Sequence, residues 1–439
     1  MRILIVIHQF FPEFSGGTER VAMNLARMAQ RAGHHVRLLA CAVEPEKYAE
    51  LRSKALLPDN QISTASAING AFDSVVQGLP ITLIPRSLMP AGADISLESN
   101  ETLVQQLTEW IRCQNFDLAH AMHTLRMGSA LQAIQRCGLP YVLTLTDFFL
   151  PCARINLVNL EGQSCPGPDR GRRCINDCAV PAWTPVAYLG RFANALAVLQ
   201  GASARIAPSD YVAQRYRDSF ENLDFQVIAH GVDLLALNAG AAPHAEPLAD
   251  KPVTSQTPLR MIFIGSIVPQ KGLEVLLKAI ALLPANAPVT LTVVGGFYGN
   301  PANHREIQRL AEADSRITLK GSLPPADVFS LLGRSDLLCL PSLVPESFSL
   351  VLHESAAAGV PALVSDLGAP PQQVLRYGCG GVVPAGDAPS WAAAIAHVLA
   401  APEQLQQWKR KLFLPLRIEE EAFFYESVWR RLCRQAVAA

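Results

Sequence analysis

The sequence predicts an α/β protein made of two doubly wound parallel-sheet domains, and three observations support this. The chain of 439 residues exceeds the size at which one hydrophobic core normally gives way to two. Half of its residues are hydrophobic and only 17% are charged, which suits well-buried sheets. A strand–loop–helix pattern also occurs twice, with apolar strands at 2–7 and 260–264 and helices expected over 18–32 and 273–283. Continuous apolar strands are typical of a sheet covered on both faces.

Further apolar runs predict the remaining strands and the domain limits. These runs are 36–40, 117–120, 141–145 and 204–207 in the first half, and 289–294, 317–319, 337–340 and 361–364 in the second. We expect a first domain over 1–232, a linker rich in Ala and Pro over 233–258, and a second domain over 259–414. An amphipathic helix is expected within 415–439, whereas 42–100 has no clear pattern and is expected to hold an inserted element.

Composition argues against several classes of protein. A formal net charge of −1 disfavours a nucleic-acid binder that relies on a broad basic surface. No apolar stretch approaches the roughly 18 residues of a membrane span, and the apolar run at 1–8 is too short for a secretion signal. We therefore expect a cytoplasmic protein with at most peripheral contact at the inner face of a membrane. Basic clusters at 170–173, 408–411 and 429–431 suit anionic lipid, although solvated faces are the commoner explanation.

The most informative stretch surrounds two glutamates that lie eight positions apart. Glu346 is expected in a loop after a strand, and Glu354 inside a helix that ends before a Gly-Val-Pro sequence. The N–H groups of Ser349, Leu350 and Val351 at the start of this helix are a natural phosphate site. These features together would bind a sugar nucleotide. One carboxylate would contact the group on one side of the diphosphate, and the other would contact the ribose on the other side. Glutamates at this spacing are common, so the pair alone also fits a loop residue and a surface helix position.

Together with its neighbours, this pair resembles the E-x7-E signature of the family 4 retaining glycosyltransferases. Pro-Glu followed by small residues, then Glu-Ser-Ala and Gly-Val-Pro, carry the resemblance. It implies the GT-B fold, in which two Rossmann-like domains face each other across a cleft and the last helix crosses back to the first domain. It also implies retaining transfer from a UDP-, GDP- or ADP-linked sugar to a glycan or lipid-linked acceptor, in cell-envelope polysaccharide synthesis and without a catalytic metal.

The resemblance implies roles for four residues of the second domain. Glu354 would hold the ribose hydroxyls, and Glu346 would orient the donor sugar. Lys271, just ahead of a helix, would stabilise the diphosphate together with the helix N–H groups, although a lone lysine often only decorates a helix start. The family usually has arginine where this chain has Ser266, which leaves one cation instead of two at the donor site.

Three positions of the first domain are further candidates. Gly17 follows a second glycine at the start of the first helix and would let the acceptor side approach, while the absence of G-x-G-x-x-G argues against a nicotinamide fingerprint. His120 and His123 follow a strand end, where ligands of open α/β sheets bind. The resemblance implies that His120 contacts the donor sugar; a satisfied histidine at a strand end is the alternative. Thr146 stands where family members often have histidine.

Four cysteines in the loop 152–178 form a separate signal. Cys152, Cys165, Cys174 and Cys178 lie close together in sequence, among proline, glycine and arginine residues. Four thiols on a loop indicate a structural zinc ion, and a subset of the family has a similar cysteine-rich insertion. Only the spacing of the last two is typical of zinc ligands, so inert thiols and two disulfides stay open.

Two other functions fit the same pattern. A nucleotide-sugar epimerase of GT-B fold would change the sugar without an acceptor. A degenerate glycosyltransferase would act as a non-catalytic scaffold, and Ser266 and Thr146 favour that reading. The joint presence of Lys271, Glu346 and Glu354 argues against it.

Overall fold

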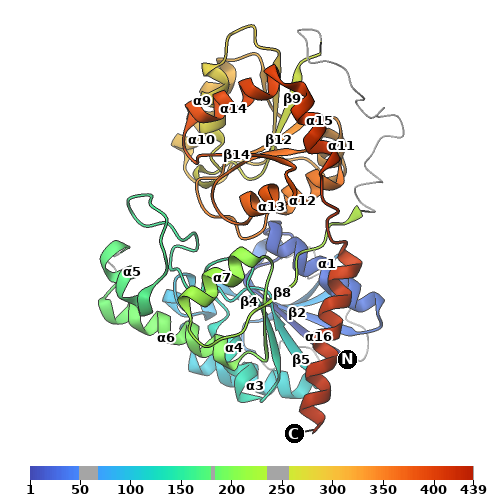
Figure 1. The fold of residues 1–439 in the computed structure, drawn as a ribbon. Coiled ribbons are helices and arrows are strands. Elements are labelled where there is room, and N and C mark those ends of the chain that lie inside the picture. The colour runs from blue at the N-terminus through green and yellow to red at the C-terminus, as the bar shows by residue number, and fades with distance from the viewer. Residues whose placement is uncertain (49–67, 179–182, 235–256, 439) are drawn as a thin grey trace. The chain divides into compact units, whose positions relative to one another are not determined.

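The computed structural model describes residues 1–48, 68–178, 183–234 and 257–438 (Figure 1). The chain divides into two compact units, one formed by residues 1–231 with 418–439 and the other by 232–417. The linker expected over 233–258 lies almost entirely outside the described residues.

The first unit contains an eight-stranded sheet. Its strands are β1 (Arg2–Ile7), β2 (His35–Ala42), β3 (Phe72–Val76), β4 (Leu79–Pro85), β5 (Leu118–Ala121), β6 (Tyr141–Thr144), β7 (Ala204–Ala207) and β8 (Gln226–Val227). They are ordered β3-β4-β2-β1-β5-β6-β7-β8, and every pair is parallel except β3–β4. The strands predicted from apolar runs in this half are confirmed. The side chains from Ile3 to Ile7 have no exposed surface, as expected of a central strand covered on both faces.

The antiparallel pair β3–β4 lies in the region where the sequence showed no pattern. Its turn is formed by Gln77 and Gly78, both with positive φ, which matches the right-handed twist of a two-residue hairpin. Asp73 on the edge strand accepts a hydrogen bond from Thr82 Oγ1 at 2.8 Å and pairs with Arg37, which places polar groups within a short strand. Because β3 contains polar as well as apolar residues, a search for apolar runs does not find it.

Helices surround the first sheet. They are α1 (Gly17–Arg31), α3 (Glu101–Gln114), α4 (Gly128–Arg136), α5 (Arg172–Asp177), α6 (Pro185–Gly201), α7 (Asp210–Ser219) and α16 (Ile418–Ala438), with 3-10 turns η1 (Pro45–Tyr48), η3 (Arg86–Leu88), η4 (Ala91–Asp94) and η5 (Asp169–Gly171). Although α16 comes from the end of the chain, it packs against α1 and β5 of the first unit (Figure 1). Its residues Tyr425 and Trp429 are buried there.

The second unit contains a six-stranded, fully parallel sheet. Its strands are β9 (Leu259–Ile264), β10 (Val289–Val294), β11 (Ile317–Leu319), β12 (Leu337–Leu340), β13 (Ala362–Ser365) and β14 (Gly380–Val383). The order β11-β10-β9-β12-β13-β14 corresponds to the 3-2-1-4-5-6 order of nucleotide-binding α/β folds. The direction of strand addition therefore reverses between β9 and β12.

Helices cover both faces of the second sheet, as predicted for buried parallel strands. They are α9 (Leu273–Leu282), α10 (Pro301–Glu312), α11 (Pro325–Gly333), α12 (Leu350–Ala357), α13 (Ala369–Tyr377), α14 (Ala388–Ala400) and α15 (Pro402–Arg410), with the 3-10 turn η6 (Pro269–Lys271). One core includes Leu276 of α9 and Trp391 of α14, and a separate core includes Leu352 of α12 and Val374 of α13. The helices predicted near 273–283 and 350–358 are confirmed.

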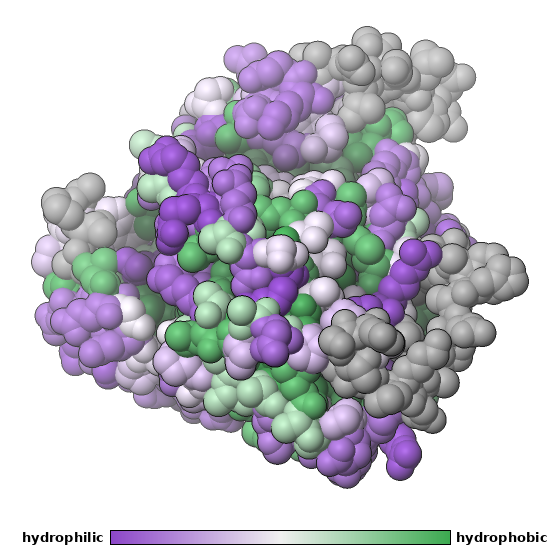
Figure 2. Space-filling model, turned by 90° about the horizontal axis from the view of Figure 1, so that it is seen from above, coloured by the Kyte–Doolittle hydropathy of each residue, from purple (hydrophilic) through white to green (hydrophobic). Residues whose placement is uncertain are grey.

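The surface is mixed in character. Figure 2 shows hydrophilic and hydrophobic residues interspersed over the face that it presents. In the described part of the chain, no helix combines the length and the hydropathy that crossing a membrane would require.

Candidate functional site

The predicted donor-binding residues of the second unit gather where β9 and β12 lie side by side, whereas Gly17, also predicted to bind the donor, lies in the first unit. Ser266 and Lys271 follow β9, whereas Glu346 and the start of α12 follow β12. Ligands of open α/β sheets bind outside the carboxyl ends of the strands at this reversal of strand order. The topology thus brings together side chains that are distant in sequence.

Gly272 allows the two loops to approach closely. Its φ is +66°, and a Cβ atom there would lie 1.8 Å from the carbonyl oxygen of Pro341. The Leu343 N–H donates to the Gln270 carbonyl at 2.8 Å, so the loop after β9 is bonded directly to the loop after β12. Any side chain at position 272 would force these loops apart.

Lys271 and Glu346 form an ion pair across these loops. The distance from Lys271 Nζ to Glu346 Oε1 is 2.9 Å, and their side chains are 38% and 11% exposed. The Ser342 hydroxyl donates to the same carboxylate oxygen. Burial by itself raises the pKa of Glu346, but the Lys271 charge and hydrogen bonds from Ser342, Lys271 and Ser349 outweigh it. The net pKa is below the ordinary glutamate value, so Glu346 is an anion at neutral pH.

A second glycine fixes the backbone of Glu346. A Cβ atom on Gly368, whose φ is +86°, would lie 2.3 Å from the Glu346 nitrogen. The Ala369 N–H donates to the Glu346 carbonyl at 2.9 Å, and Glu346 forms a parallel bridge with Gly368. The loop that carries Glu346 is therefore anchored beside the start of α13.

Ser349 forms the N-cap of α12 in an unusual conformation. Its φ is +76°, which is strained for a residue with a side chain, and its hydroxyl accepts from the Leu352 N–H at 3.4 Å. His353 Nδ1 donates to the Ser349 carbonyl at 3.0 Å. The N–H groups of Leu350 and Val351 lie in the first turn, where a helix offers no acceptor of its own. They and the helix dipole form a site suited to an anion.

Glu354 lies one turn further along α12. Its exposed fraction is 3%, so it is not a solvated position on the surface of the helix. Ser266, in contrast, is exposed at the end of β9.

In the first unit, the loop after β1 brings a buried carboxylate to the carboxyl edge of the sheet. Gly17 is exposed at the start of α1, and Glu19 is buried two residues later. Gln9 Nε2 donates to Glu19 at 3.0 Å, and His8 Nε2 lies 3.6 Å from the same oxygen. Burial raises the pKa of Glu19. From the sequence, Glu19 was only part of the pattern around the Gly-Gly loop, and neither Glu19 nor His8 was given a role at the site.

His120 has no exposed surface. Its Nε2 lies 2.7 Å from Thr144 Oγ1, and its ring centroid is 4.9 Å from that of Tyr425 and 5.7 Å from that of Trp429. Burial lowers its pKa to about 3, so the imidazole is neutral. This enclosed position is that of a core histidine and gives no support to the predicted sugar contact, but the histidine is only half satisfied, because its buried Nδ1 has no hydrogen-bond partner among the described residues.

His123, three residues later, is also buried but belongs to a polar cluster. Its ring stacks on His8 with centroids 3.9 Å apart, and its Nε2 pairs with Asp147. The Leu125 N–H donates to Nδ1 at 3.1 Å, so Nδ1 is an acceptor and the proton lies on Nε2. Thr146 donates to the Met122 carbonyl at 3.2 Å.

The four clustered cysteines lie in the first unit and differ in burial. Cys152, Cys165 and Cys178 are buried and Cys174 is half-buried. Burial raises the pKa of Cys174 to about 12, and the charges of the other three add to this effect. All ten cysteines of the chain are free thiols, so the two disulfides considered above are not formed here. Over the described ranges, no three His, Cys, Asp or Glu side chains are placed to hold a metal ion.

Curated proteins with similar sequences are glycosyltransferases. A D-inositol 3-phosphate glycosyltransferase of Segniliparus rotundus is 34% identical over 207 residues, which cover 46% of this chain and 44% of the relative. A phosphatidyl-myo-inositol mannosyltransferase of Mycolicibacterium smegmatis is 25% identical over 404 residues, covering 91% of this chain and 85% of the relative. The chain thus spans less than half the length of the first of these relatives.

Solved structures show the same fold at low sequence identity. Anabaena HepE in complex with UDP and glucose has a TM-score of 0.66 at 15% identity and covers 97% of this chain and 98% of its own. Sucrose-phosphate synthase from Thermosynechococcus elongatus has a TM-score of 0.68 at 19% identity, with coverage of 98% and 99%. These similarities, with the two parallel-sheet units, identify the fold class as GT-B.

Two family profiles match successive parts of the chain. "Glycosyl transferases group 1" matches residues 246–412, which include Lys271, Glu346 and Glu354. "Glycosyltransferase Family 4" matches residues 15–234, which make up half of the chain. The protein therefore belongs to Glycosyltransferase Family 4.

Proposed function

We propose that this protein transfers a sugar, with retention of configuration, from a nucleotide-diphosphate sugar to a glycan or lipid-linked acceptor. The observation that carries the proposal is the Lys271–Glu346 pair beside the capped N-terminus of α12. A cation and helix N–H groups suit a diphosphate, and an ionised carboxylate suits sugar hydroxyls. Their place at the reversal of strand order is where such folds bind nucleotides.

Each residue has a separate role in donor binding. Glu354 accepts hydrogen bonds from the ribose hydroxyls, and Glu346 accepts from hydroxyls of the transferred sugar. The Leu350 and Val351 N–H groups bind the diphosphate, with Lys271 as a point charge. Because the Lys271 side chain is 38% exposed while it contacts Glu346, one ammonium group can bridge the carboxylate and a phosphate.

The proposed reaction exchanges one bond at the anomeric carbon of the donor sugar and moves one proton. The bond between the anomeric carbon and the diphosphate oxygen breaks, and a bond to the acceptor oxygen forms on the same face. The acceptor hydroxyl proton passes to the departing phosphate oxygen. Lys271 and the N–H groups of α12 stabilise the negative charge that develops on this oxygen, and the proposed step uses no metal cofactor.

The first unit supplies the acceptor side in this proposal. Gly17, exposed at the start of α1, leaves room for the acceptor. His123 takes the sugar-contact role that the sequence suggested for His120, because His120 is enclosed by α16. Synthesis of a cell-envelope glycan by a cytoplasmic enzyme at the inner face of the membrane is the setting that we propose.

Nucleotide binding tests the donor site. Thermal unfolding is recorded with UDP, GDP, ADP and their sugar derivatives, for the wild type, Glu354→Ala and the control Glu312→Ala. Glu312 is an exposed glutamate on α10 of the same unit. We expect one nucleotide to stabilise the wild type and the control but not Glu354→Ala. No stabilisation of the folded wild type by any nucleotide would refute the proposal and favour the scaffold.

Product analysis then separates transfer from epimerisation. Incubation with donor alone is compared with incubation in the presence of candidate acceptors. An altered free sugar or sugar nucleotide formed without acceptor would identify an epimerase instead.

We also propose that the loop 152–178 holds a structural zinc ion. The support for this proposal is the sequence, in which four cysteines fall within one loop, since the described part of the chain places no three of them as metal ligands. Metal analysis of protein purified without chelator should give one zinc per chain, lost in Cys174→Ala and kept in the control Cys113→Ala, an exposed cysteine. Four freely titrating thiols in metal-free, folded protein would contradict it.

A further inference from the structure

Arg126 is held in a conformation that few residues adopt. It follows β5 at the carboxyl edge of the first sheet and has a φ of +63°. A left-handed conformation is unfavourable for a residue with a side chain, so glycine would be the expected occupant. The loop instead places a long cationic side chain there, and such strain is commonest at functional sites.

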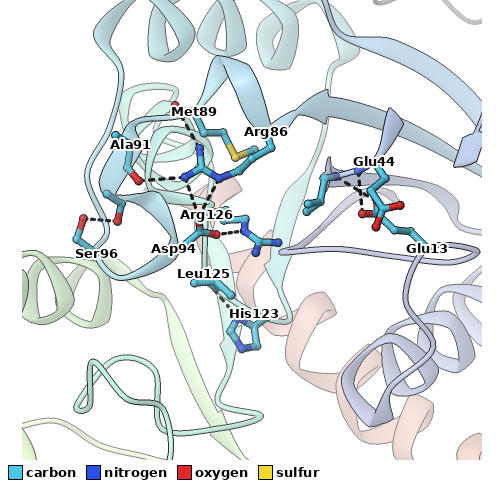
Figure 3. A network of polar contacts seen from close by, with 12 residues as sticks. Glu13, Glu44, Arg86, Met89, Ala91, Asp94, Ser96, His123, Leu125 and Arg126 are labelled. Carbon is cyan, nitrogen blue, oxygen red and sulfur yellow. Dashed lines mark hydrogen bonds and ion pairs between the residues drawn. The ribbon is translucent and has the colours of Figure 1, made fainter. Parts of the chain in front are cut away.

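Asp94 orients the Arg126 guanidinium. Arg126 Nε donates to Asp94 Oδ1, while Arg86 donates to Asp94 Oδ2 from Nη2 at 2.7 Å and from Nε at 3.0 Å (Figure 3). Arg86 also donates to the carbonyls of Ala91 and Met89. Arg86 therefore stabilises the loop that follows it through contacts with Asp94 and two carbonyls, whereas Arg126 contacts Asp94 through Nε alone.

One nitrogen of the Arg126 guanidinium, Nη1, lacks a hydrogen-bond acceptor among the described residues. The side chain is only 16% exposed, and within the described residues its buried Nη1 has no hydrogen-bond acceptor. Leaving a buried donor without a partner destabilises the folded protein, and more so when the group is charged. Such an N–H group is satisfied when a ligand or water supplies the acceptor.

Two guanidinium groups meet at one carboxylate in this part of the first unit. Arg86 and Arg126 share the single carboxylate of Asp94. The nearby Glu13 carboxylate accepts the Val43 and Glu44 N–H groups at 3.1 and 2.9 Å, so it is directed toward backbone. Figure 3 shows Glu13 on a different loop from Arg126.

The buried imidazole of His8 adds a second unpaired nitrogen beside this charge. Burial lowers the pKa of His8, and the charge of Arg126 lowers it further, so the ring is neutral. Its Nδ1 is buried and has no partner in the described part of the chain. Glu19 lies on the other side of the ring, 3.6 Å from Nε2, and also accepts from Gln9.

We propose that Arg126, oriented by Asp94 and flanked by His8, forms an anion-binding subsite that receives a phosphate or carboxylate group of the acceptor. The assignment to the acceptor rests on the proposed function, in which the donor diphosphate is bound by Lys271 and α12 of the other unit. An anion in the first unit is then a separate group. A guanidinium presents a fork of N–H donors that matches two oxygens of one oxyanion, which a single sugar hydroxyl does not provide.

Inorganic phosphate and acetate are the first probes. Their binding is measured by calorimetry for the wild type, Arg126→Gln, Arg126→Lys and the control Arg136→Gln. Arg136 forms an exposed ion pair with Glu101 on the same unit. We expect phosphate or acetate affinity to fall at least tenfold in Arg126→Gln, to fall less in Arg126→Lys, and to stay unchanged in the control. Equal affinity in folded wild type and Arg126→Gln would overturn the subsite.

Transfer assays then test the link to the acceptor. Pairs of acceptor sugars that differ only in a phosphate or a carboxylate are compared. Arg126→Gln should lower kcat/KM for the charged member at least tenfold, while the Kd for the donor nucleotide stays unchanged. The preferred charged member distinguishes phosphate from carboxylate, and equal use of the neutral member by the wild type would overturn the assignment. Loss of nucleotide binding in Glu354→Ala confirms that the donor proposal stands independently of this result.

Discussion

Replacement of Gly272 by alanine tests how the donor site is assembled. The added Cβ would lie 1.8 Å from the Pro341 carbonyl oxygen and 2.8 Å from its carbon, both backbone atoms that cannot rotate away. The φ of +66° adds roughly 1–2 kcal/mol of strain. Overpacking adds about 1–3 kcal/mol, because the loop carrying Lys271 must move away from the loop after β12. We therefore expect the free energy of unfolding of the second unit to fall by about 2–5 kcal/mol.

Gly321→Ala is the matched control for this variant. Gly321 lies in the same unit with a φ of +67°, but a Cβ there would meet no atom within 4 Å. It should lose only the roughly 1–2 kcal/mol of backbone strain. Hydrogen exchange in urea, followed in peptides from residues 259–417, measures both losses, and nucleotide titration measures donor affinity. Equal loss of stability in the two variants, or unchanged donor affinity in Gly272→Ala, would refute the role of this close contact.

Four further predictions concern individual side chains. Lys271→Ala should lower kcat by about 10²–10³-fold, as removal of one transition-state donor does elsewhere, whereas Lys278→Ala, an exposed lysine paired with Glu274, should not. Because the pKa of Glu346 is lowered in the folded state, its stabilising effect is present above the ordinary glutamate pKa and is lost as pH falls through the folded value. The stabilities of the wild type and Glu346→Gln should therefore approach each other as pH falls below the ordinary pKa and become equal below the lowered pKa of the folded state, and a constant difference in acid unfolding would contradict the ion pair. Ser349→Ala should destabilise by about 1 kcal/mol and Ser349→Gly by less, since glycine relieves the positive φ; the reverse order in chemical unfolding would count against strain at the cap. His120→Ala should cost about 2–4 kcal/mol in unfolding experiments through loss of core packing while leaving the KM for the donor unchanged, and a raised KM with normal stability would restore the sugar contact.

Local sequence signals were sufficient for most of the regular structure. The predicted strands at 2–7 and 289–294 coincide with β1 and β10. In β1 every residue from Ile3 to Ile7 is apolar, because a strand buried on both faces needs no polar residue there. The helix expected from Leu350 was bounded by Ser349 and by the Gly-Val-Pro sequence, and the structure ends it at Ala357. The hairpin β3–β4 was missed because its edge strand includes Asp73 and Ser74, although Gln77-Gly78 is a recognisable turn signal.

The different surroundings of His120 and His123 could not be predicted from the local sequence. His120 and His123 both follow the same strand, and nothing in their immediate sequence separates a core residue from one in a polar cluster. Their separation depends on α16, whose Tyr425 and Trp429 come from the other end of the chain and cover His120. The left-handed conformation of Arg126 could not be predicted from the sequence either. In a residue other than glycine this conformation follows from packing and not from residue type.

By itself, the sequence determined the positions of the predicted strands and the helix that carries Glu354, because these depend on hydrophobic period and on capping residues within a few positions. Only the tertiary structure decided which of the predicted residues meet. Lys271 and Glu346 are 75 positions apart and pair because β9 and β12 are neighbours and because Gly272 and Gly368 permit close backbone contact. Contacts of this kind depend on the order of strands in a sheet, which no local pattern specifies.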